Sequence, residues 1–198
     1  RIAVDHRVFE DLRSALDERG NVKPVKRPGV ESRCEILETA FARKASDMTK
    51  YDIQIFAEIV DASTVTVDAI LKRAEDYVRK GANVIDLGCL PDTPFPRLEE
   101  AVRALKEKDY EVSVDSADAD ELLRGGKAGA DFLLSLNEDT LHIADKVKST
   151  PVLIPKEHGD LPSLYRAMDA LDKKGRAYLA DPVLDPINFG FMESLERY

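Results

Sequence analysis

The sequence predicts an α/β protein in which helices cover a parallel sheet, and it favours a barrel over a dinucleotide-binding sheet. Six short apolar runs start 29, 28, 20, 20 and 25 residues apart, which is the length of one strand plus one crossover helix. Strict alternation of strands and helices implies parallel strands with helices on the sheet faces. No strand is followed by a Gly-x-Gly-x-x-Gly or Walker signature, so the dinucleotide-binding alternative is disfavoured.

The segment before these repeats, residues 1–52, reads as a separate unit. We predict a short strand at residues 2–4, a helix over 9–19, a linker punctuated by Pro24 and Pro28, and a second helix around Ile36 and Phe41. We interpret this unit as the end of a preceding domain, and residues 53–198 as the barrel domain. Because the first residue is Arg1 rather than Met, the chain is expected to be a piece of a longer protein.

The predicted strands occupy residues 55–60, 84–87, 112–114, 132–136, 152–154 and 177–179. Amphipathic helices follow several of them, as shown by apolar stripes over residues 67–78, 98–105 and 161–171. Thr66 is the predicted N-cap of the first stripe and Gly81 its C-terminal stop. Gly125 and Gly126 are predicted to end another helix.

Composition excludes several classes of function. The 198 residues contain 29 Lys and Arg against 38 Asp and Glu, a net charge of −9, which disfavours nucleic acid as a partner. No run approaches the ~18 apolar residues of a membrane span, and no basic-then-apolar leader opens the chain. Cys34 and Cys89 form no CxxC pair, so we expect inert thiols in a reducing cytoplasm.

Four of the six predicted strands finish on an aspartate: Asp61, Asp86, Asp115 and Asp181. Aspartate is depleted in strands, and the carboxyl ends of parallel strands are where α/β folds bind ligands. Taken singly, each aspartate is also explained as a helix cap or a turn residue. Four at equivalent positions favour a ligand site.

Converging carboxylates repel one another unless a cation or a ligand rich in N–H donors lies between them. No histidine accompanies them at the spacing of a transition-metal motif, so we assign no metal site, and Mg²⁺ stays open. A 2-amino-4-oxo-pterin carries a ring N–H beside an exocyclic amine, and one carboxylate can accept both. A pterin is one example of an organic ligand that would suit such carboxylates.

Four motifs then resemble those of a known family. Residues 81–88 (GANVIDLG), 112–116 (VSVDS), 129–133 (GADFL) and 179–182 (LADP) look like successive strand motifs of the pterin-binding barrels typified by dihydropteroate synthase, in the same order from about Ile55 onward. Residues 57–61 (AEIVD) and 181–186 (DPVLDP) are most similar to the divergent dihydropteroate synthase-related proteins of archaea and methylotrophs.

The resemblance implies a TIM-type (β/α)₈ barrel and a cytoplasmic transferase. Such an enzyme joins a reduced pterin diphosphate to an arylamine in folate or tetrahydromethanopterin biosynthesis. Within this family pattern, Asp115 and Asp181 would bind the pterin edge, and Asp61 stands where the family has Asn. The full set of implied pterin-binding residues is Asp61, Asp86, Asp115, Ser135, Asn137 and Asp181. Lys156 and His158 are the implied anion-binding residues, and no catalytic residue is assigned.

Departures from the family pattern keep two alternatives open. The family's Asn-Asp pair is here Leu134-Ser135, the Arg after the second strand is replaced within residues 92–96 with Arg97 displaced, and residues 187–191 lack the Gly-rich turn ending in Lys. One alternative is a non-synthase pterin protein of one-carbon metabolism, either a methyltransferase-type barrel or an accessory subunit. The other is a scaffold barrel without a small-molecule role. A homodimer is also left open.

The length sets one further expectation. The residues from Ile55 onward suffice for six strand–helix units, whereas a complete eight-unit barrel takes about 250 residues. We therefore predict a partial barrel with a gap between its first and last strands, filled by chain beyond this sequence.

Overall fold

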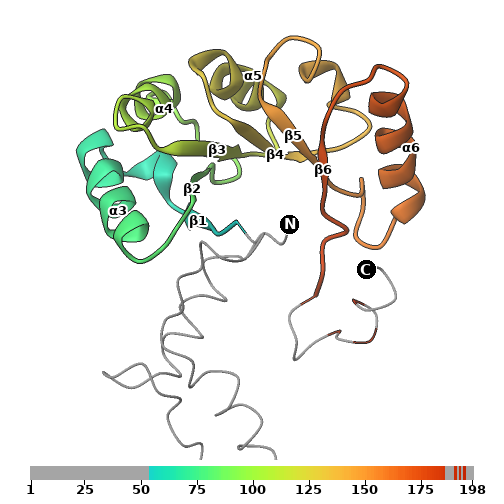
Figure 1. Ribbon diagram of the computed structural model, residues 1–198, viewed down its shortest axis with the longest axis horizontal. Helices are drawn as coiled ribbons and strands as arrows, with labels where there is room; N and C mark the ends of the chain where they lie inside the picture. The colour runs from blue at the N-terminus through green and yellow to red at the C-terminus, as the bar shows by residue number, and fades with distance from the viewer. Residues whose placement is uncertain (1–53, 186–189, 191, 193, 195–198) are drawn as a thin grey trace, which may run out of the picture.

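The computed structural model describes residues 54–185, 190, 192 and 194, and these form one parallel sheet with helices along its outer side (Figure 1). The six strands lie in the order β1-β2-β3-β4-β5-β6, so each pairs with its neighbours in sequence. The strands are β1 (Phe56–Ile59), β2 (Val84–Gly88), β3 (Glu111–Asp115), β4 (Phe132–Leu136), β5 (Thr150–Leu153) and β6 (Leu179–Ala180). The helical elements are η2 (Ala62–Thr64), α3 (Val67–Arg79), α4 (Leu98–Lys106), α5 (Ala119–Ala128), η3 (Leu141–Ile143) and α6 (Leu161–Asp172).

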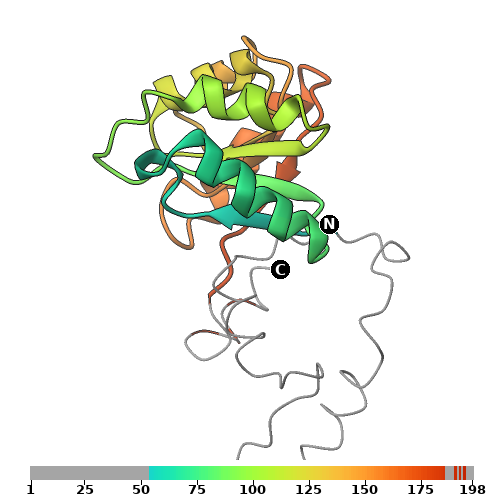
Figure 2. The ribbon, with the colours of Figure 1, turned by 90° about the vertical axis from the view of Figure 1, so that its left-hand side faces the viewer.

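Helices α3 to α6 follow an arc, with the strands inside it (Figures 1 and 2). Strands and helices thus form the successive units of a barrel wall, as the sequence predicts. The expected alternation of strand and α-helix fails once, because β4 is followed by the 3-10 helix η3 instead of an α-helix. Thr140 accepts the Asn137 N–H and Ile143 is buried, so a short polar turn with one apolar anchor covers this part of the sheet.

Local chemistry explains where the helices begin. The Thr66 hydroxyl accepts a hydrogen bond from the Ala69 N–H at 3.2 Å, and Gly81 takes a left-handed φ of 106° just after α3. Asp118 caps α5 and Asp160 caps α6 in the same way, through carboxylate oxygens that accept backbone N–H groups. The predicted start and stop of α3 are confirmed.

The prediction that Gly125 and Gly126 end a helix is wrong. Both lie inside α5, whose left-handed C-cap is Gly129 at φ 107°. Their function is close packing, because a Cβ on Gly125 would lie 2.8 Å from Val114 Cγ2 and one on Gly126 2.7 Å from Val147 Cγ1. The missing side chains allow α5 to approach β3 and the segment before β5.

Two apolar clusters sit on the two faces of the sheet. The larger lies between strands and helices and includes Ile85, Leu87, Val114 and Leu133. The smaller lies on the inner face, where Phe56, Val84, Phe132 and Val152 pack together and the rings of Phe56 and Phe132 meet edge to face at 5.1 Å. Because side chains alternate along a strand, the residues two positions after Phe56 and Val84 also face inward.

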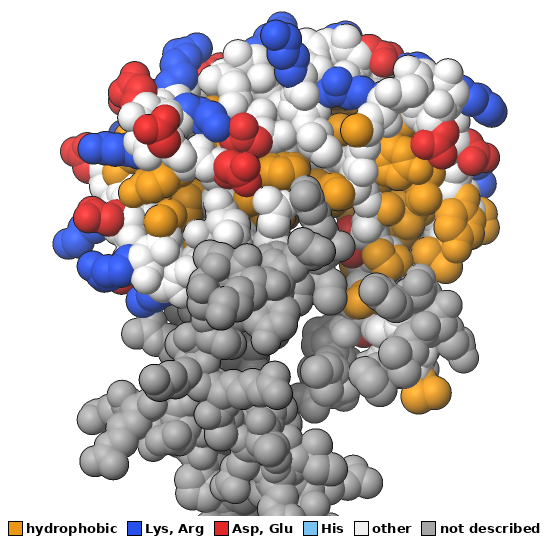
Figure 3. Space-filling view, in the orientation of Figure 1, with side chains coloured by type: hydrophobic (Ala, Val, Ile, Leu, Met, Phe, Trp, Pro, Cys, Tyr) orange, Lys and Arg blue, Asp and Glu red, His pale blue; other side chains and the backbone are white. Residues whose placement is uncertain are grey.

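The sheet is open in the part of the chain that the structure describes. β1 pairs with β2 and β6 with β5, and the two outer strands do not pair with each other. Hydrophobic side chains gather on the α6 side of the molecule (Figure 3), and Tyr165 of α6 is 55% exposed. Six parallel strands with interleaved helices are a partial TIM-type barrel, as expected from the length.

The predicted N-terminal unit, residues 1–52 with its strand and two helices, lies outside the described residues. Across the described ranges, none of the helices combines the length and the apolar character that crossing a bilayer requires.

Candidate functional site

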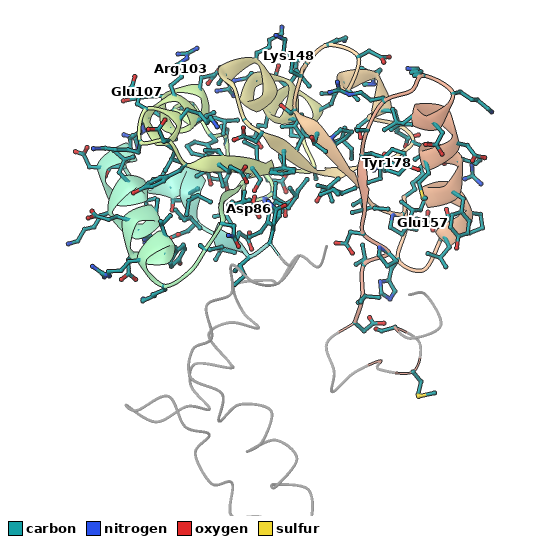
Figure 4. All side chains as sticks on the ribbon, in the orientation of Figure 1. Asp86, Arg103, Glu107, Lys148, Glu157 and Tyr178 are labelled. Carbon is teal, nitrogen blue, oxygen red and sulfur yellow. The ribbon has the colours of Figure 1, made fainter. Side chains whose placement is uncertain are left out.

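The inner face of the first three strands carries an acidic cluster. Glu58 is in register with Asp86, and Asp115 is in register with Gly88, so three neighbouring strands contribute one carboxylate each. Carboxylate oxygens of Glu58, Asp86 and Asp115 all lie within 4.8 Å of one another. We call these three residues the acidic triad. Figure 4 labels Asp86 on the inner side of the arc, away from Arg103, Glu107 and Lys148 on the helical side.

Asp86 is the most buried member of the triad, at 4% exposure. The Ser113 hydroxyl on β3 donates to its Oδ1 at 2.6 Å. The prediction that Asp86 ends its strand is wrong, because β2 continues to Gly88. Asp86 is thus in the middle of the strand, and its depth allows the triad to extend below the rim of the barrel.

Glu58 is a member of the triad that no sequence motif singles out as a site residue. Its Oε1 lies only 2.5 Å from where a Cβ on Gly88 would be, so the glycine makes room for this carboxylate between β1 and β2. A signal was available, because Glu58 has the same inward phase as Phe56 in a strand with buried residues at both ends. A charged residue in that phase must face the barrel interior.

Asp115 ends β3, and the Ser135 hydroxyl donates to its Oδ1. Ser135 has a positive φ of 69°, and the pairing of β4 with β5 shifts register between Leu133 and Leu136. Such a bulge adds one residue to a strand and redirects a side chain, here the hydroxyl toward the neighbouring strand. The structure therefore brings Asp86, Asp115 and Ser135 together, with Glu58 added.

The other proposed pterin-binding residues have local partners. Asp61 forms an ion pair with Arg73 on α3, and each side chain is about two-fifths exposed. Asn137 Oδ1 accepts the Asp139 N–H at 3.0 Å, and Asp181 Oδ1 accepts the Val183 N–H at 2.8 Å just after β6. None of these three belongs to the acidic triad.

The two expected anion-binding residues also have acidic neighbours. Lys156 Nζ lies 2.8 Å from Asp139 Oδ2, and this contact raises the pKa of the Lys156 ammonium above its usual value. His158 Nε2 lies 3.3 Å from Asp185 Oδ1, and the imidazole is 60% exposed. Both follow β5 and lie in an exposed loop.

Of the two cysteines expected to be inert, Cys89 lies directly after β2, and Cys34 lies outside the described residues. Burial raises the pKa of the Cys89 thiol, and the nearby Glu121 carboxylate raises it further. The thiol therefore stays protonated at neutral pH, which makes it a poor nucleophile.

A depression of about 810 Å³ opens at the other end of the sheet, among the first residues of β3, β4 and β5. Its lining includes Glu111, Phe132 and Thr150 together with Lys127 and Lys146. In α/β barrels the amino ends of the strands serve stability, whereas ligands bind at the carboxyl ends. The acidic triad lies on the side that the fold uses for ligands.

Chemically, the triad can accept several hydrogen bonds from one ligand. Three carboxylates within 4.8 Å of one another favour a bound group that brings positive charge or N–H donors. All the ligand atoms are carboxylate oxygens, the type that Mg²⁺ and other hard cations take, so Glu58, Asp86 and Asp115 could also hold a divalent cation.

No family model matches the chain. Solved structures of similar fold include the 7,8-dihydropteroate synthase of Vibrio fischeri, with 21% identity and a TM-score of 0.58, covering 73% of this chain and 68% of that one. Burkholderia cenocepacia dihydropteroate synthase, complexed with 7,8-dihydropteroate, gives 18% identity and a TM-score of 0.54 over 66% and 58% of the two chains. The Coxiella burnetii enzyme, in complex with pteroic acid, gives 20% and 0.54 over 69% and 63%.

A curated relative, an uncharacterized protein of Methanocaldococcus jannaschii, is 26% identical. The match covers 74% of this chain and 32% of that protein, so the chain spans about a third of this relative. The likeness to the solved structures establishes the fold: the chain has the partial barrel of the dihydropteroate synthases.

Proposed function

We propose that this chain, which has the fold of the dihydropteroate synthases, forms the pterin-binding part of a transferase of the same type. The observation that carries the proposal is the acidic triad on the inner face of β1, β2 and β3. A reduced pterin presents a ring N–H and an amino group side by side, and a carboxylate accepts both in a fork. A second or third carboxylate nearby can accept the remaining amine hydrogen.

In this proposal Asp115 binds the pterin edge, oriented by Ser135, while Asp86 and Glu58 enclose the amino group from the deeper side. Asp86 keeps its orientation through Ser113. Asp181 and Asn137 would contact the pterin from the carboxyl ends of β6 and β4, and Asp61 from that of β1. A divalent cation on the triad, Mg²⁺ by its oxygen donors, is the competing occupant of the same oxygens.

The proposed reaction joins the pterin to an arylamine. The amine nitrogen forms a bond to the methylene carbon of the pterin diphosphate, the C–O bond to diphosphate breaks, and diphosphate leaves with the electron pair. The amine proton passes to solvent. The chain's own residues bind and orient the pterin, and Lys156 and His158 are the proposed contacts for the departing anion, which cationic groups stabilise electrostatically.

A second candidate is a pterin-binding protein without synthase activity. It is favoured because two cationic side chains near the rim already have partners within the chain. Arg97, in the loop where the family has an Arg, donates to the Val65 carbonyl at 3.1 Å. Lys156 is paired with Asp139. A diphosphate would have to compete with these partners, whereas a pterin presented to a partner protein would need none of them.

Titration calorimetry of the full-length protein with a reduced pterin, with and without its diphosphate, separates these candidates. Turnover with an arylamine, and tighter binding of the diphosphate form, support the synthase. Equal binding of both forms without turnover supports the second candidate. Absence of binding by both forms contradicts the proposal itself. If the experiment supports the synthase, we propose that the protein acts in folate or tetrahydromethanopterin biosynthesis in the cytoplasm.

A further inference from the structure

The loop between β2 and α4, residues 89–97, follows Gly88 directly and so borders the acidic triad. Phe95 anchors this loop, since its side chain is 1% exposed within the helix-facing core. Both polar groups of its backbone bind side chains of α5. Its N–H donates to Glu121 Oε1 at 3.2 Å, and its carbonyl accepts from Arg124 Nη2 at 2.9 Å.

The same two side chains reach further structural elements. Arg124 also forms a two-point contact with Glu99 in the first turn of α4, with distances of 2.8 and 2.6 Å. Glu121, a buried carboxylate, accepts the Ser116 hydroxyl at 2.6 Å. Ser116 is the residue directly after Asp115. Helices α4 and α5 lie next to each other along the arc (Figure 1), so side chains of α5 can reach residues of α4 and of the loop before it.

The contacts form a continuous path from the loop to the triad. From the Phe95 backbone it passes through Glu121 to Ser116, and from there along the chain to Asp115. A buried carboxylate that accepts two hydrogen bonds holds both donors in place, because losing either bond would leave a buried polar group without a partner. The loop and the end of β3 are therefore restrained by the same carboxylate, that of Glu121.

We infer that Glu121 and Arg124 are positioning residues of the ligand site: they hold the loop after β2 as a fixed wall and set the position of Asp115. This inference rests on the proposed pterin binding. Neither residue has to touch the ligand, because Glu121 acts through Phe95 and Ser116, and Arg124 acts through the Phe95 carbonyl and Glu99. The fixed wall favours a ligand that enters a preformed site over one that closes a mobile loop on itself.

The test compares Glu121→Ala, Glu121→Gln and Ser149→Ala. Gln can still accept the Phe95 N–H and can donate an amide hydrogen to Ser116, so it is the conservative variant. Ser149 is the matched control, since its buried hydroxyl donates to the Ala130 carbonyl at 2.6 Å at the opposite end of the sheet. The readouts are Kd for a reduced pterin, hydrogen exchange of amides 89–97 and 115–118, and Tm.

We expect Glu121→Ala to weaken pterin binding about tenfold and to speed exchange in both segments by a similar factor. Glu121→Gln should stay within about threefold of wild type in both measurements. Ser149→Ala should lower Tm like Glu121→Ala while leaving Kd and exchange at 89–97 unchanged.

Wild-type affinity in a folded Glu121→Ala protein would overturn the inference, and so would an equal loss of affinity in Ser149→Ala. If the wild-type protein binds no pterin, the proposed function fails. The exchange data then still decide the structural half of the inference: faster exchange at 89–97 in Glu121→Ala supports the positioning contacts, and unchanged exchange rejects them.

Discussion

The carboxylate of Glu58 occupies the space above Gly88 that a side chain would otherwise fill. Its Oε1 lies 2.5 Å, and the Cα of Val60 3.0 Å, from the position of a Cβ on that glycine. Gly88 has no positive φ, so the requirement for glycine at this position is one of space rather than of backbone conformation. The proximity of Glu58 to Asp115 depends on the absence of a side chain at Gly88.

Gly88→Ala should therefore displace the Glu58 carboxylate from the triad. We expect a loss of about 1–3 kcal/mol in the free energy of unfolding from overpacking, and weaker pterin binding. A double-mutant cycle with Glu58→Ala checks the cause. Once Glu58 is shortened, the extra methyl group should cost less, so a strictly additive double mutant would show that the Glu58 contact is not the cause.

Asp115→Asn should weaken pterin binding by about 1.5–3 kcal/mol, roughly ten- to hundredfold in Kd, because an amide offers one acceptor where the carboxylate offers two. Calorimetric titration measures the effect. The control is Asp109→Asn in the exposed turn before β3, where φ is 59° and Asn is well tolerated. Equal affinities of the two variants would remove Asp115 from the proposed site.

Gly126→Ala tests whether packing outweighs helix propensity in α5. Alanine gains about 1 kcal/mol over glycine inside a helix, but here its Cβ would lie 2.7 Å from Val147 Cγ1. We expect a net loss of about 1–2 kcal/mol in urea unfolding. Val147→Ala in the same chain should recover part of that loss. A rise in the urea midpoint for Gly126→Ala alone would contradict the packing argument.

The ion pair between Glu99 and Arg124 predicts a pH dependence of stability. The hydrogen bond to Arg124 lowers the pKa of Glu99 from 4.5 to about 2. A depressed pKa in the folded state gives stability that is present above the unfolded value of 4.5 and is lost as the pH falls toward 2. Since both side chains are partly exposed, solvent screening limits the contribution to about 1 kcal/mol.

Glu99→Gln should therefore be less stable than wild type by about 1 kcal/mol at pH 6, with the difference shrinking toward zero near pH 2. The control is Glu100→Gln, which removes the same charge from the first turn of α4 at an exposed position. Urea unfolding across this pH range gives the comparison. A difference that grows on acidification would have the wrong sign for the pair.

The sequence predicts the strand positions well because strands covered on both faces appear as short apolar runs, as in β2, which is buried at every position. The six runs correspond to β1 to β6, and only their ends differ, by a few residues. The α3 boundaries are also predictable, because Thr66 and Gly81 act through local hydrogen bonding and local φ. The error at Gly125 and Gly126 has a tertiary cause, since their closeness to Val114 and Val147 depends on how α5 lies on the sheet.

The site is less predictable than the fold. The sequence singles out Asp86 and Asp115, two members of the acidic triad, by their positions in two neighbouring strands. The ion pair between Asp61 and Arg73 is not predictable in this way, because it depends on side-chain geometry and on no sequence motif. The left-handed Ser135 and its bulge depend on strand register, which no local pattern in residues 132–136 specifies. Glu58 was predictable from its phase in β1.

The linear order of the strands also affects how the molecule unfolds. Each strand is paired only with its sequence neighbours in the described part of the chain, so the arrangement behaves like a short solenoid in which stability is shared between adjacent units. Loss of β6 and α6 would remove strand pairing from β5 alone, which is two strands away from β3, the nearest strand of the acidic triad. Within the described residues β6 is the shortest strand, with two residues, so fraying from that edge should begin three strands away from β3 and should leave Glu58, Asp86 and Asp115 in place at first.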